Sequence, residues 1–233
     1  EISLIIITLD RPALLEAALA SIETQTKKPD QIVVIDNGPS PDTARVVESF
    51  RSRLPVERFE EPRRGFGAAR NRGLREARGG ILVFLDDDCR AEPRWIEKLL
   101  APLHRDEADI VGGSRVCVTP GLLARLDYLS TDAPVLHPRL PRGAAPSLST
   151  SNLAMRARVA HEVGEFDETL ATCEDRDFCL RARARGFRLL YEPAACVEHQ
   201  PPVTTLSGYA RRMVRYGLGT SQYFLRHRRE EKL

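Results

Sequence analysis

Three consecutive aspartates, Asp86, Asp87 and Asp88, directly follow the apolar run from Ile81 to Leu85. A short apolar run predicts a buried strand, and in open α/β sheets ligands bind beyond the carboxyl ends of the strands. Adjacent carboxylates repel one another, so they need a compensating cation or full solvation. Mg²⁺ or Mn²⁺ would supply that charge, because hard divalent cations prefer oxygen ligands. The alternative is a solvated acidic turn.

A fourth aspartate, Asp36, ends a second apolar run, Ile32–Ile35. A carboxylate at this place can accept hydrogen bonds from a ribose or a base. The alternative is a strand-end turn, because Asn37-Gly38 follows and Asn-Gly is a turn signal.

A glycine-containing segment, Arg63–Asn71, superficially suggests a dinucleotide-binding loop. It departs from the G-x-G-x-x-G spacing, because Arg70 stands where the third glycine is required. This departure disfavours an NAD-binding domain. We interpret the segment as a turn into a helix whose basic groups can meet a nucleotide.

An acidic cluster, Cys173–Asp177, opens a predicted helix. Acidic residues in a first turn are favoured by the helix macrodipole, which is the simpler explanation. The functional alternative is a general base that removes a proton from an acceptor hydroxyl.

His199 ends a short apolar segment and follows Glu198. A neutral imidazole at this place can serve as a third metal ligand. The alternative is an ordinary core or surface histidine.

The elements that must position these residues alternate between strand and helix in the first 120 residues. Apolar runs predict strands over 2–8, 32–35, 56–59, 81–85 and 109–118. Between them we expect four helices. The first is capped by Asp10 and has Pro12 in its first turn, and the second begins at Asp42. The third covers 67–77, and the fourth begins at Pro93. This order predicts an α/β fold with a mostly parallel sheet and helices on both faces.

The pattern weakens after Pro120, and we divide the chain into a first region over 1–119, a Pro-rich connecting loop over 120–147, a second region over 148–202 and a basic helical tail over 203–233. Within the second half we expect strands over 151–156, 187–191 and 196–199 and a helix over 174–185. The 233-residue length, with 42% hydrophobic and 29% charged residues, indicates one large domain or two small ones. No apolar run is long enough to span a bilayer.

The distribution of charge indicates which partners the chain can bind, and the cysteines indicate its redox compartment. The tail 203–233 holds seven basic and two acidic side chains, whereas the remaining chain is mildly acidic. A nucleic-acid partner is therefore not expected. The tail either packs on the domain or contacts an anionic membrane peripherally. Five cysteines without a C-x-x-C pair favour reduced thiols and a cytoplasmic location, with the inner membrane face as the peripheral alternative.

Eight short segments form an ordered set over nearly the whole chain. They are Ile-Ile-Ile-Thr-Leu-Asp-Arg-Pro (5–12), Ile-Val-Val-Ile-Asp-Asn-Gly (32–38), Gly-Phe-Gly-Ala-Ala-Arg-Asn-Arg-Gly (65–73), Phe-Leu-Asp-Asp-Asp (84–88), Thr-Ser-Asn-Leu-Ala-Met-Arg (150–156), Gly-Glu-Phe-Asp-Glu (164–168), Glu-Asp-Arg-Asp-Phe-Cys-Leu-Arg (174–181) and Val-Glu-His (197–199). Together they resemble the family 2 glycosyltransferases of the GT-A fold.

The resemblance implies a Rossmann-like GT-A fold with an acceptor-side region in its C-terminal part, a nucleotide-sugar donor and a divalent metal, Mn²⁺ or Mg²⁺. It makes 1–119 the nucleotide-sugar-binding half and 148–202 the acceptor and catalytic half of the same domain. The nucleotide-binding residues it implies are Thr8, Leu9, Asp36, Arg70, Asp86 and Asp87. Asp88, the last acid of a DXD-like motif, and His199 would hold the metal. Asp175 would be the catalytic base beside Glu174, and Trp95 and Asn152 would face the donor sugar or the acceptor. Leu9 stands where an aromatic residue is common, so it does not stack on a base as a ring would.

The activity implied is an inverting hexosyl transfer to a saccharide, a lipid-linked or a small-molecule acceptor, as in glycan or cell-envelope synthesis. Two alternatives stay open. A sugar nucleotidyltransferase would be expected to carry a Gly-rich loop with a lysine after the first strand, where this chain has Thr-Leu-Asp-Arg-Pro. A nucleotide-sugar-binding domain without turnover is disfavoured by the Glu174-Asp175 pair.

Overall fold

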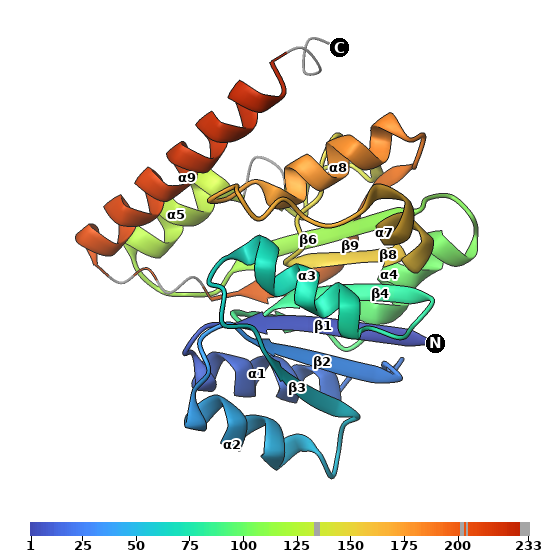
Figure 1. Ribbon diagram of the computed structural model, residues 1–233, viewed down its shortest axis with the longest axis vertical. Coiled ribbons are helices and arrows are strands. Elements are labelled where there is room, and N and C mark those ends of the chain that lie inside the picture. The colour runs from blue at the N-terminus through green and yellow to red at the C-terminus, as the bar shows by residue number, and fades with distance from the viewer. Residues whose placement is uncertain (133–135, 201–202, 204, 229–233) are drawn as a thin grey trace.

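The first strand, β1 (Ile2–Thr8), is buried along its whole length and lies inside a sheet. This computed structural model describes residues 1–132, 136–200, 203 and 205–228. Within these residues nine strands form one sheet, and helices cover both of its faces (Figure 1). Its apolar, β-branched sequence explains the position of β1, because strands buried on both faces read as near-continuous hydrophobic runs.

Three further strands pair in parallel with β1 or with one another. They are β2 (Gln31–Asp36), β3 (Val56–Glu60) and β4 (Ile81–Asp86). Their order in the sheet is β3-β2-β1-β4. Thr8 pairs with Asp36, and Ile7 pairs with Asp86, so the carboxyl ends of β1, β2 and β4 meet at one edge.

Helices bury the two faces of the sheet in separate cores. One face is covered by α1 (Pro12–Glu23), α2 (Pro41–Phe50) and α4 (Trp95–His104). The other is covered by α3 (Phe66–Glu76), α7 (Ala157–Val163) and α8 (Glu174–Ala184). In α1 the buried residues recur at helical spacing, from Leu15 through Ala18 and Leu19 to Ile22.

The second half of the sheet is mixed. Its strands are β5 (Cys89–Ala91), β6 (Ile110–Cys117), β7 (Gly143–Ala144), β8 (Asn152–Arg156) and β9 (Leu189–His199). The order continues from β4 as β8-β6-β9-β5, and β7 pairs with β9. Strand β8 is antiparallel to both neighbours, whereas β6 and β9 are parallel. The expected fold class, an α/β sheet flanked by helices, is confirmed.

Two helices extend the domain at one end. Helix α5 (Leu122–Thr131) and helix α9 (Leu206–Arg226) lie beside each other (Figure 1). Tyr209 on α9 meets Ser130 on α5 with 3.3 Å between their hydroxyl oxygens. Of the helices in the described part of the chain, none combines the length and apolarity that a bilayer crossing requires.

Several local predictions were wrong. Residues 120–147, expected as a loop, contain α5 and β7, and the short elements β5 and α7 were not expected. The two strands expected over 187–191 and 196–199 are one strand, β9. Asp10 does not cap α1: the cap position is Arg11, and no side chain bonds to the helix end there. All five cysteines are free thiols, as expected.

Candidate functional site

Two adjoining cavities lie over the carboxyl ends of the parallel strands. The larger, about 630 Å³, is lined among others by Thr8, Leu9, Asp87, Asp88 and His199. The smaller, about 350 Å³, is lined among others by Arg70, Glu174 and Asp175. Both are lined by Phe66, Asp86, Arg115 and Tyr216. Residues that the sequence placed in separate motifs therefore share one cleft with two compartments.

The negative charge of Asp87 and Asp88 is partly balanced by an arginine of the same chain. Arg11, on the loop after β1, forms ion pairs with Asp87 at 2.8 Å and with Asp88 at 3.1 Å. The Thr8 hydroxyl donates a hydrogen bond to Asp87 at 2.7 Å. Burial nevertheless raises the pKa of Asp87 to about 7, against the attraction of Arg11. The charge of the run is thus partly compensated by Arg11, which the sequence analysis did not single out.

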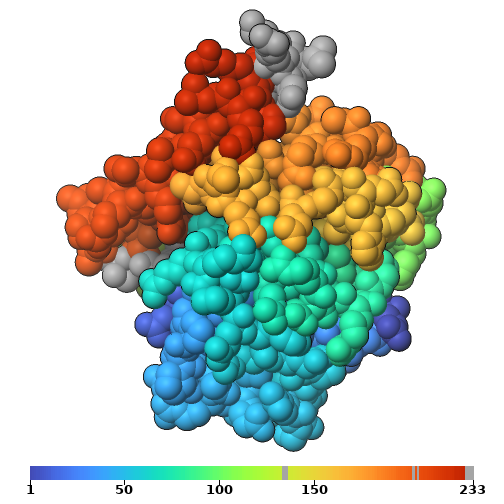
Figure 2. Space-filling view, viewed as in Figure 1, coloured from blue at the N-terminus to red at the C-terminus, as the bar shows by residue number. Residues whose placement is uncertain are grey.

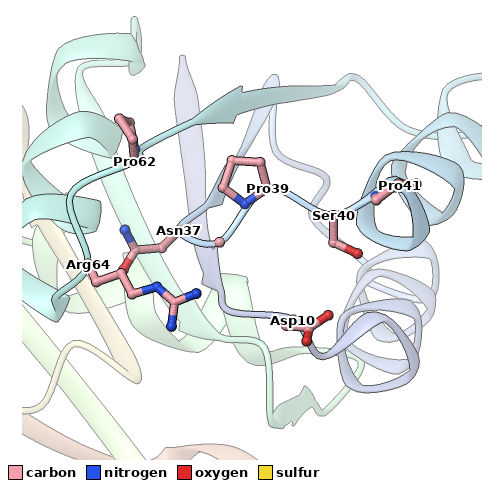
Figure 3. Close-up of a pocket in the computed structure, with 8 residues that line it drawn as sticks. Asp10, Asn37, Pro39, Ser40, Pro41, Pro62 and Arg64 are labelled. Carbon is pink, nitrogen blue, oxygen red and sulfur yellow. The ribbon is translucent and has the colours of Figure 1, made fainter.

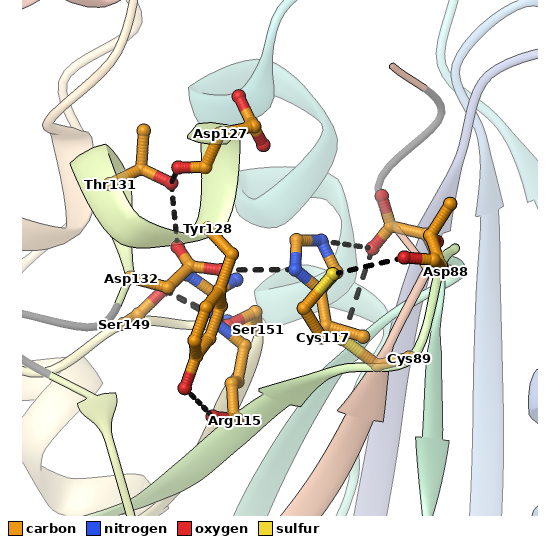
Figure 4. Close-up of polar contacts among 12 residues, drawn as sticks. Asp88, Cys89, Arg115, Cys117, Asp127, Tyr128, Thr131, Asp132, Ser149 and Ser151 are labelled. Carbon is orange, nitrogen blue, oxygen red and sulfur yellow. Dashed lines mark hydrogen bonds and ion pairs between the residues drawn. The ribbon is translucent and has the colours of Figure 1, made fainter. Parts of the chain in front are cut away.

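His199 lies between two carboxylates at the inner end of the larger cavity. Its Nε2 is 3.6 Å from Asp88 and its Nδ1 is 3.0 Å from Asp132, and both His199 and Asp132 are buried. Asp132 is also paired with Arg115, while the Tyr128 hydroxyl donates to the Arg115 carbonyl at 2.9 Å (Figure 4). Burial opposes a charged imidazole, but the two carboxylates outweigh it and raise the pKa of His199. Burial would also raise the pKa of Asp88, but His199 and Arg11 lower it well below its usual range.

The donor set at this point fits a divalent cation that takes most of its ligands from a substrate. Asp88 offers a carboxylate oxygen and His199 a ring nitrogen. The other ring nitrogen lies 3.0 Å from Asp132, as an ion-pair contact without the alignment of a hydrogen bond. A carboxylate beside the second ring nitrogen is common behind metal-binding histidines. In the described residues no group of three or more His, Cys, Asp or Glu side chains is arranged to hold a metal. Mg²⁺-type sites with one or two protein ligands are completed by phosphate oxygens and water.

Arg70 connects the two acidic motifs. Its guanidinium is buried, pairs with Glu174 at the start of α8, and lies 3.3 Å from Asp86 at the end of β4. Burial raises the pKa of Glu174 to about 7, although Arg70 works in the opposite direction. Arg70 lines the smaller cavity and is absent from the lining of the larger one. Arg70 therefore lies between the acidic groups of the two compartments, and its expected contact with the nucleoside stays a prediction.

Asp175 is the second acidic residue of α8 and lines the smaller cavity. It is half-buried, and one carboxylate oxygen accepts a hydrogen bond from the Arg176 N–H at 2.8 Å. The preceding Cys173 adopts a left-handed backbone, with φ of 70°, which turns the chain into the helix. A carboxylate with access to this cavity can accept a proton from a bound hydroxyl.

Asp36 is fully buried and lines neither cavity. It accepts hydrogen bonds from Arg58 at 2.9 Å and from the Ser40 N–H at 3.3 Å. Its neighbour Asn37 lines the larger cavity and also a third one of about 500 Å³. That third cavity extends the cleft over the ends of β2 and β3, between Asn37, Ser40 and Arg64 (Figure 3).

Trp95 and Asn152 form a buried pair away from the cavities. The Trp95 Nε1–H donates to Asn152 Oδ1 at 2.7 Å, and neither side chain is exposed by more than 1%. The Asn152 amide nitrogen donates to the carbonyls of Ser114 and Ala195 at 2.8 and 2.9 Å. Neither residue lines any of the three cavities described in this section. Because both side chains are buried against other protein groups, we propose a packing role for them in place of the expected contact with a sugar.

Several cleft residues had no signal in the sequence. Arg115 and Asp132 are brought together from β6 and from the end of α5, and Arg212, Arg215 and Tyr216 are brought in by α9. None of them belongs to a recognisable motif. Only Arg11 could have been found, since it lies inside the first of the eight segments.

The sequence of this chain is similar to those of known glycosyltransferases. The profile of the family described as glycosyl transferase family 2 matches residues 3–164. Pre-mycofactocin glycosyltransferase of Mycobacterium tuberculosis is 30% identical over 210 residues, which cover 84% of this chain and 43% of that protein. The chain therefore spans less than half of that relative.

Solved structures with the same fold include two with nucleotide sugars. The mannosyltransferase PcManGT from Pyrobaculum calidifontis, in complex with GDP-Man and Mn²⁺, gives a TM-score of 0.76 at 22% identity and covers 98% of this chain and 64% of that one. TarS of S. aureus in complex with UDP-GlcNAc gives 0.70 at 18% identity, covering 88% of this chain and 60% of that one. These identities establish the GT-A fold alone. With the family profile covering most of the chain, the protein belongs to glycosyl transferase family 2.

Proposed function

We propose that this chain is the catalytic unit of an inverting, metal-dependent glycosyltransferase that moves a sugar from a nucleoside-diphosphate sugar to an acceptor hydroxyl. One observation carries the proposal. Through Arg70, the acidic end of β4 and the acidic start of α8 meet in one cleft with two compartments. A donor site and an acceptor site must adjoin in the same way, because the reacting atoms of the two substrates have to touch.

The donor is assigned to the larger compartment. Leu9, Asn37 and Arg64 line it, and Asn37 and Arg64 also line the cavity of Figure 3, so we assign the nucleoside to this end. Asp86 and Asp87 line its inner part, where the nucleotide continues toward the sugar. The related structures hold GDP-Man and UDP-GlcNAc, so guanine and uracil donors are the first to test.

Asp88 and His199 are assigned to the metal. A bound Mn²⁺ or Mg²⁺ would neutralise charge on the diphosphate as it leaves. Asp88 keeps a carboxylate at this position, because the pKa of its carboxyl is held low by His199 and Arg11. His199 would present Nε2 while Asp132 holds Nδ1.

The transfer step is assigned to the smaller compartment. Asp175 takes the proton of an acceptor hydroxyl, whose oxygen forms the new bond to the anomeric carbon. The bond from that carbon to the diphosphate breaks on the opposite face, and the nucleoside diphosphate leaves with the electron pair. One displacement inverts the configuration. Glu174 has a different task in this proposal. Its carboxyl is buried against Arg70 and keeps that guanidinium in place beside Asp175.

The test is Asp175→Asn, measured for both transfer and donor binding. We expect the transfer rate to fall by about 10²–10⁴-fold, the usual contribution of a general base, with the donor Kd unchanged. Donor binding is measured first by thermal shift with UDP, GDP and dTDP, each with and without Mn²⁺. At ligand near 100 times Kd, binding adds about 2.7 kcal/mol, or roughly 5–11 °C in Tm for a chain of this size.

Two results would contradict the proposal. Wild-type transfer by Asp175→Asn would remove Asp175 from the base role. Nucleotide binding without any transfer or donor hydrolysis in the wild-type chain would identify a binding domain instead.

A further inference from the structure

Helix α9 presents two chemically different faces. On its inner face, Arg212 and Tyr216 line the larger cavity, and Tyr216 and Thr220 line the smaller one. Arg212 is also paired with the buried Asp127 of α5 at 2.8 Å. This face is polar and aromatic, and it anchors the helix to the cleft.

The outer face of α9 carries four exposed apolar side chains, with two exposed serines, Ser207 and Ser221, among them. Leu206, Val214, Leu218 and Leu225 are 71%, 73%, 54% and 62% exposed, respectively. Their spacing places them on one side of a helix. In an ordinary surface helix such a stripe faces the core, whereas here it faces outward, and Figure 2 shows α9 standing on the surface with its outer side uncovered in that view. We call these four residues the outer stripe.

The charge of α9 complements an anionic surface. The helix contains four arginines and no acidic residue. Arg211 beside the outer stripe and Arg228 just beyond the helix are exposed, and within the described part of the chain neither lies within salt-bridge distance of a carboxylate. Exposed arginines beside an apolar stripe are typical of helices that lie in the plane of a membrane interface.

We propose that α9 docks the protein on an anionic membrane surface through the outer stripe and its neighbouring arginines. The apolar side chains would enter the boundary between headgroups and acyl chains, and the arginines would meet anionic headgroups. Because the inner face of the same helix lines both cavities, docking brings the cleft next to the bilayer. Resting on the proposed function, this assigns the acceptor to molecules carried in the membrane plane.

Binding to vesicles tests the proposal without reference to transfer. The wild-type chain is sedimented with vesicles of phosphatidylcholine and phosphatidylglycerol, and with vesicles of phosphatidylcholine alone. We expect binding to the anionic vesicles that weakens with salt, since the attraction is screened. The triple variant Val214→Gln/Leu218→Gln/Leu225→Gln should bind at least about tenfold more weakly, because it removes most of the apolar area. Arg211→Gln should lower binding about fivefold.

A matched control keeps the helix and changes the same face. Ser207→Gln/Ser221→Gln alters two exposed polar residues of α9 and should bind like the wild type. Nucleotide binding by thermal shift is measured for every variant. A triple variant that still binds nucleotide but no longer binds vesicles supports docking through the outer stripe. If the wild type itself binds no nucleotide, the proposed function is contradicted, and the vesicle result still stands.

The orientation of α9 can be read from fluorescence. Trp95 is the only tryptophan of the chain and is fully buried. Leu218→Trp therefore introduces a reporter in the outer stripe, and Arg45→Trp places one on α2, at the far side of the sheet. Brominated phosphatidylglycerol vesicles should quench the first reporter and leave the second unaffected.

Three outcomes would overturn the proposal. They are equal binding of the triple variant and the wild type, no binding of the wild type to anionic vesicles, and a concentration-dependent dimer that the triple variant abolishes without any vesicle binding. The last would assign the outer stripe to a second copy of the chain.

Discussion

His199 Nδ1 lies 3.0 Å from Asp132 Oδ2, and both side chains are buried. Asp132 therefore orients the ring so that Nε2 faces Asp88. We expect Asp132→Asn to weaken Mn²⁺ binding about 10–100-fold, the usual cost of losing a partner behind a metal-binding histidine. Titration of Mn²⁺ by electron paramagnetic resonance, in the presence of UDP or GDP, measures this directly.

Asp127→Asn is the matched control for Asp132→Asn. Asp127 is also buried, lies on α5, which ends just before Asp132, and is paired with Arg212 instead of His199. It should keep its Mn²⁺ affinity. Equal loss of affinity in both variants would mean that helix packing, rather than orientation of His199, is responsible.

Glu174 makes stability depend on pH. Burial raises the pKa of its carboxyl from 4.5 to about 7, so the folded state holds this proton more tightly than the unfolded chain. The resulting stabilisation is complete below about pH 4.5 and is lost as the pH rises through about 7. The loss is on the order of 3 kcal/mol, because the pKa rises from 4.5 to about 7 and each pKa unit corresponds to about 1.4 kcal/mol.

Urea unfolding of the wild type and Glu174→Gln between pH 4.5 and 8 isolates this effect. The uncharged amide cannot titrate, so the stability of the variant relative to the wild type should increase with pH. Asp87, whose pKa is also raised to about 7, contributes equally to both proteins and cancels in the difference. A constant difference across this range would show that Glu174 does not titrate there.

Asn152 should matter for stability rather than for sugar recognition. Asn152→Ala would leave the Trp95 N–H and the carbonyls of Ser114 and Ala195 without their partner. A buried polar group without a hydrogen bond costs about 1–3 kcal/mol, so we expect a loss of about 3–5 kcal/mol in the free energy of unfolding. Denaturant unfolding and the donor Kd are measured together. A stable variant with a weakened donor Kd would instead place Asn152 at the sugar.

Gly219 allows α9 to approach the segment just before Glu174 and Asp175. A Cβ atom at this position would meet Thr172 Oγ1 at 2.0 Å and the Thr172 backbone nitrogen at 2.7 Å. Gly219→Ala should therefore shift α9 away from the cleft, lower stability by about 1–3 kcal/mol and reduce transfer. Thermal unfolding and kcat are the measurements.

Gly217, two residues earlier, is the matched control. A Cβ atom there meets nothing within 4 Å, so Gly217→Ala should raise stability by about 0.5–1 kcal/mol through helix propensity and leave transfer unchanged. If both variants behaved alike, the close approach at Gly219 would be irrelevant.

The sequence predicted the first half of the fold well for a physical reason. Buried parallel strands such as β1 and β4 are continuous apolar runs, and the polar residues that follow them fall at one edge of the sheet. Thr8, Asp86, Asp87 and Asp88 could be expected in one cleft on that basis, and they line the larger cavity.

The rest depends on contacts between distant segments. The pairing of Arg115 with Asp132 and of Arg70 with Glu174 joins residues whose separation along the chain carries no pattern. Helix α5 was missed because its leucines at 122, 126 and 129 face outward and prolines surround the segment, so no core-facing stripe distinguished it from a loop. The roles assigned to Asp175, Asp88 and His199 stay predictions until the variants are measured.

The irregular pairing between β6 and β9 determines where His199 faces. Gly113 pairs with Glu192, but the next residue, Ser114, pairs with Cys196, so residues 193–195 are inserted into β9. Three is an odd number, and side chains alternate along a strand, so every residue after the insertion points to the face opposite to the one that regular pairing would give. Asn152 bonds to Ala195 within that insertion. The phase of β9, and with it the side of the sheet on which the histidine emerges, is thus set by three residues that lie outside the cleft.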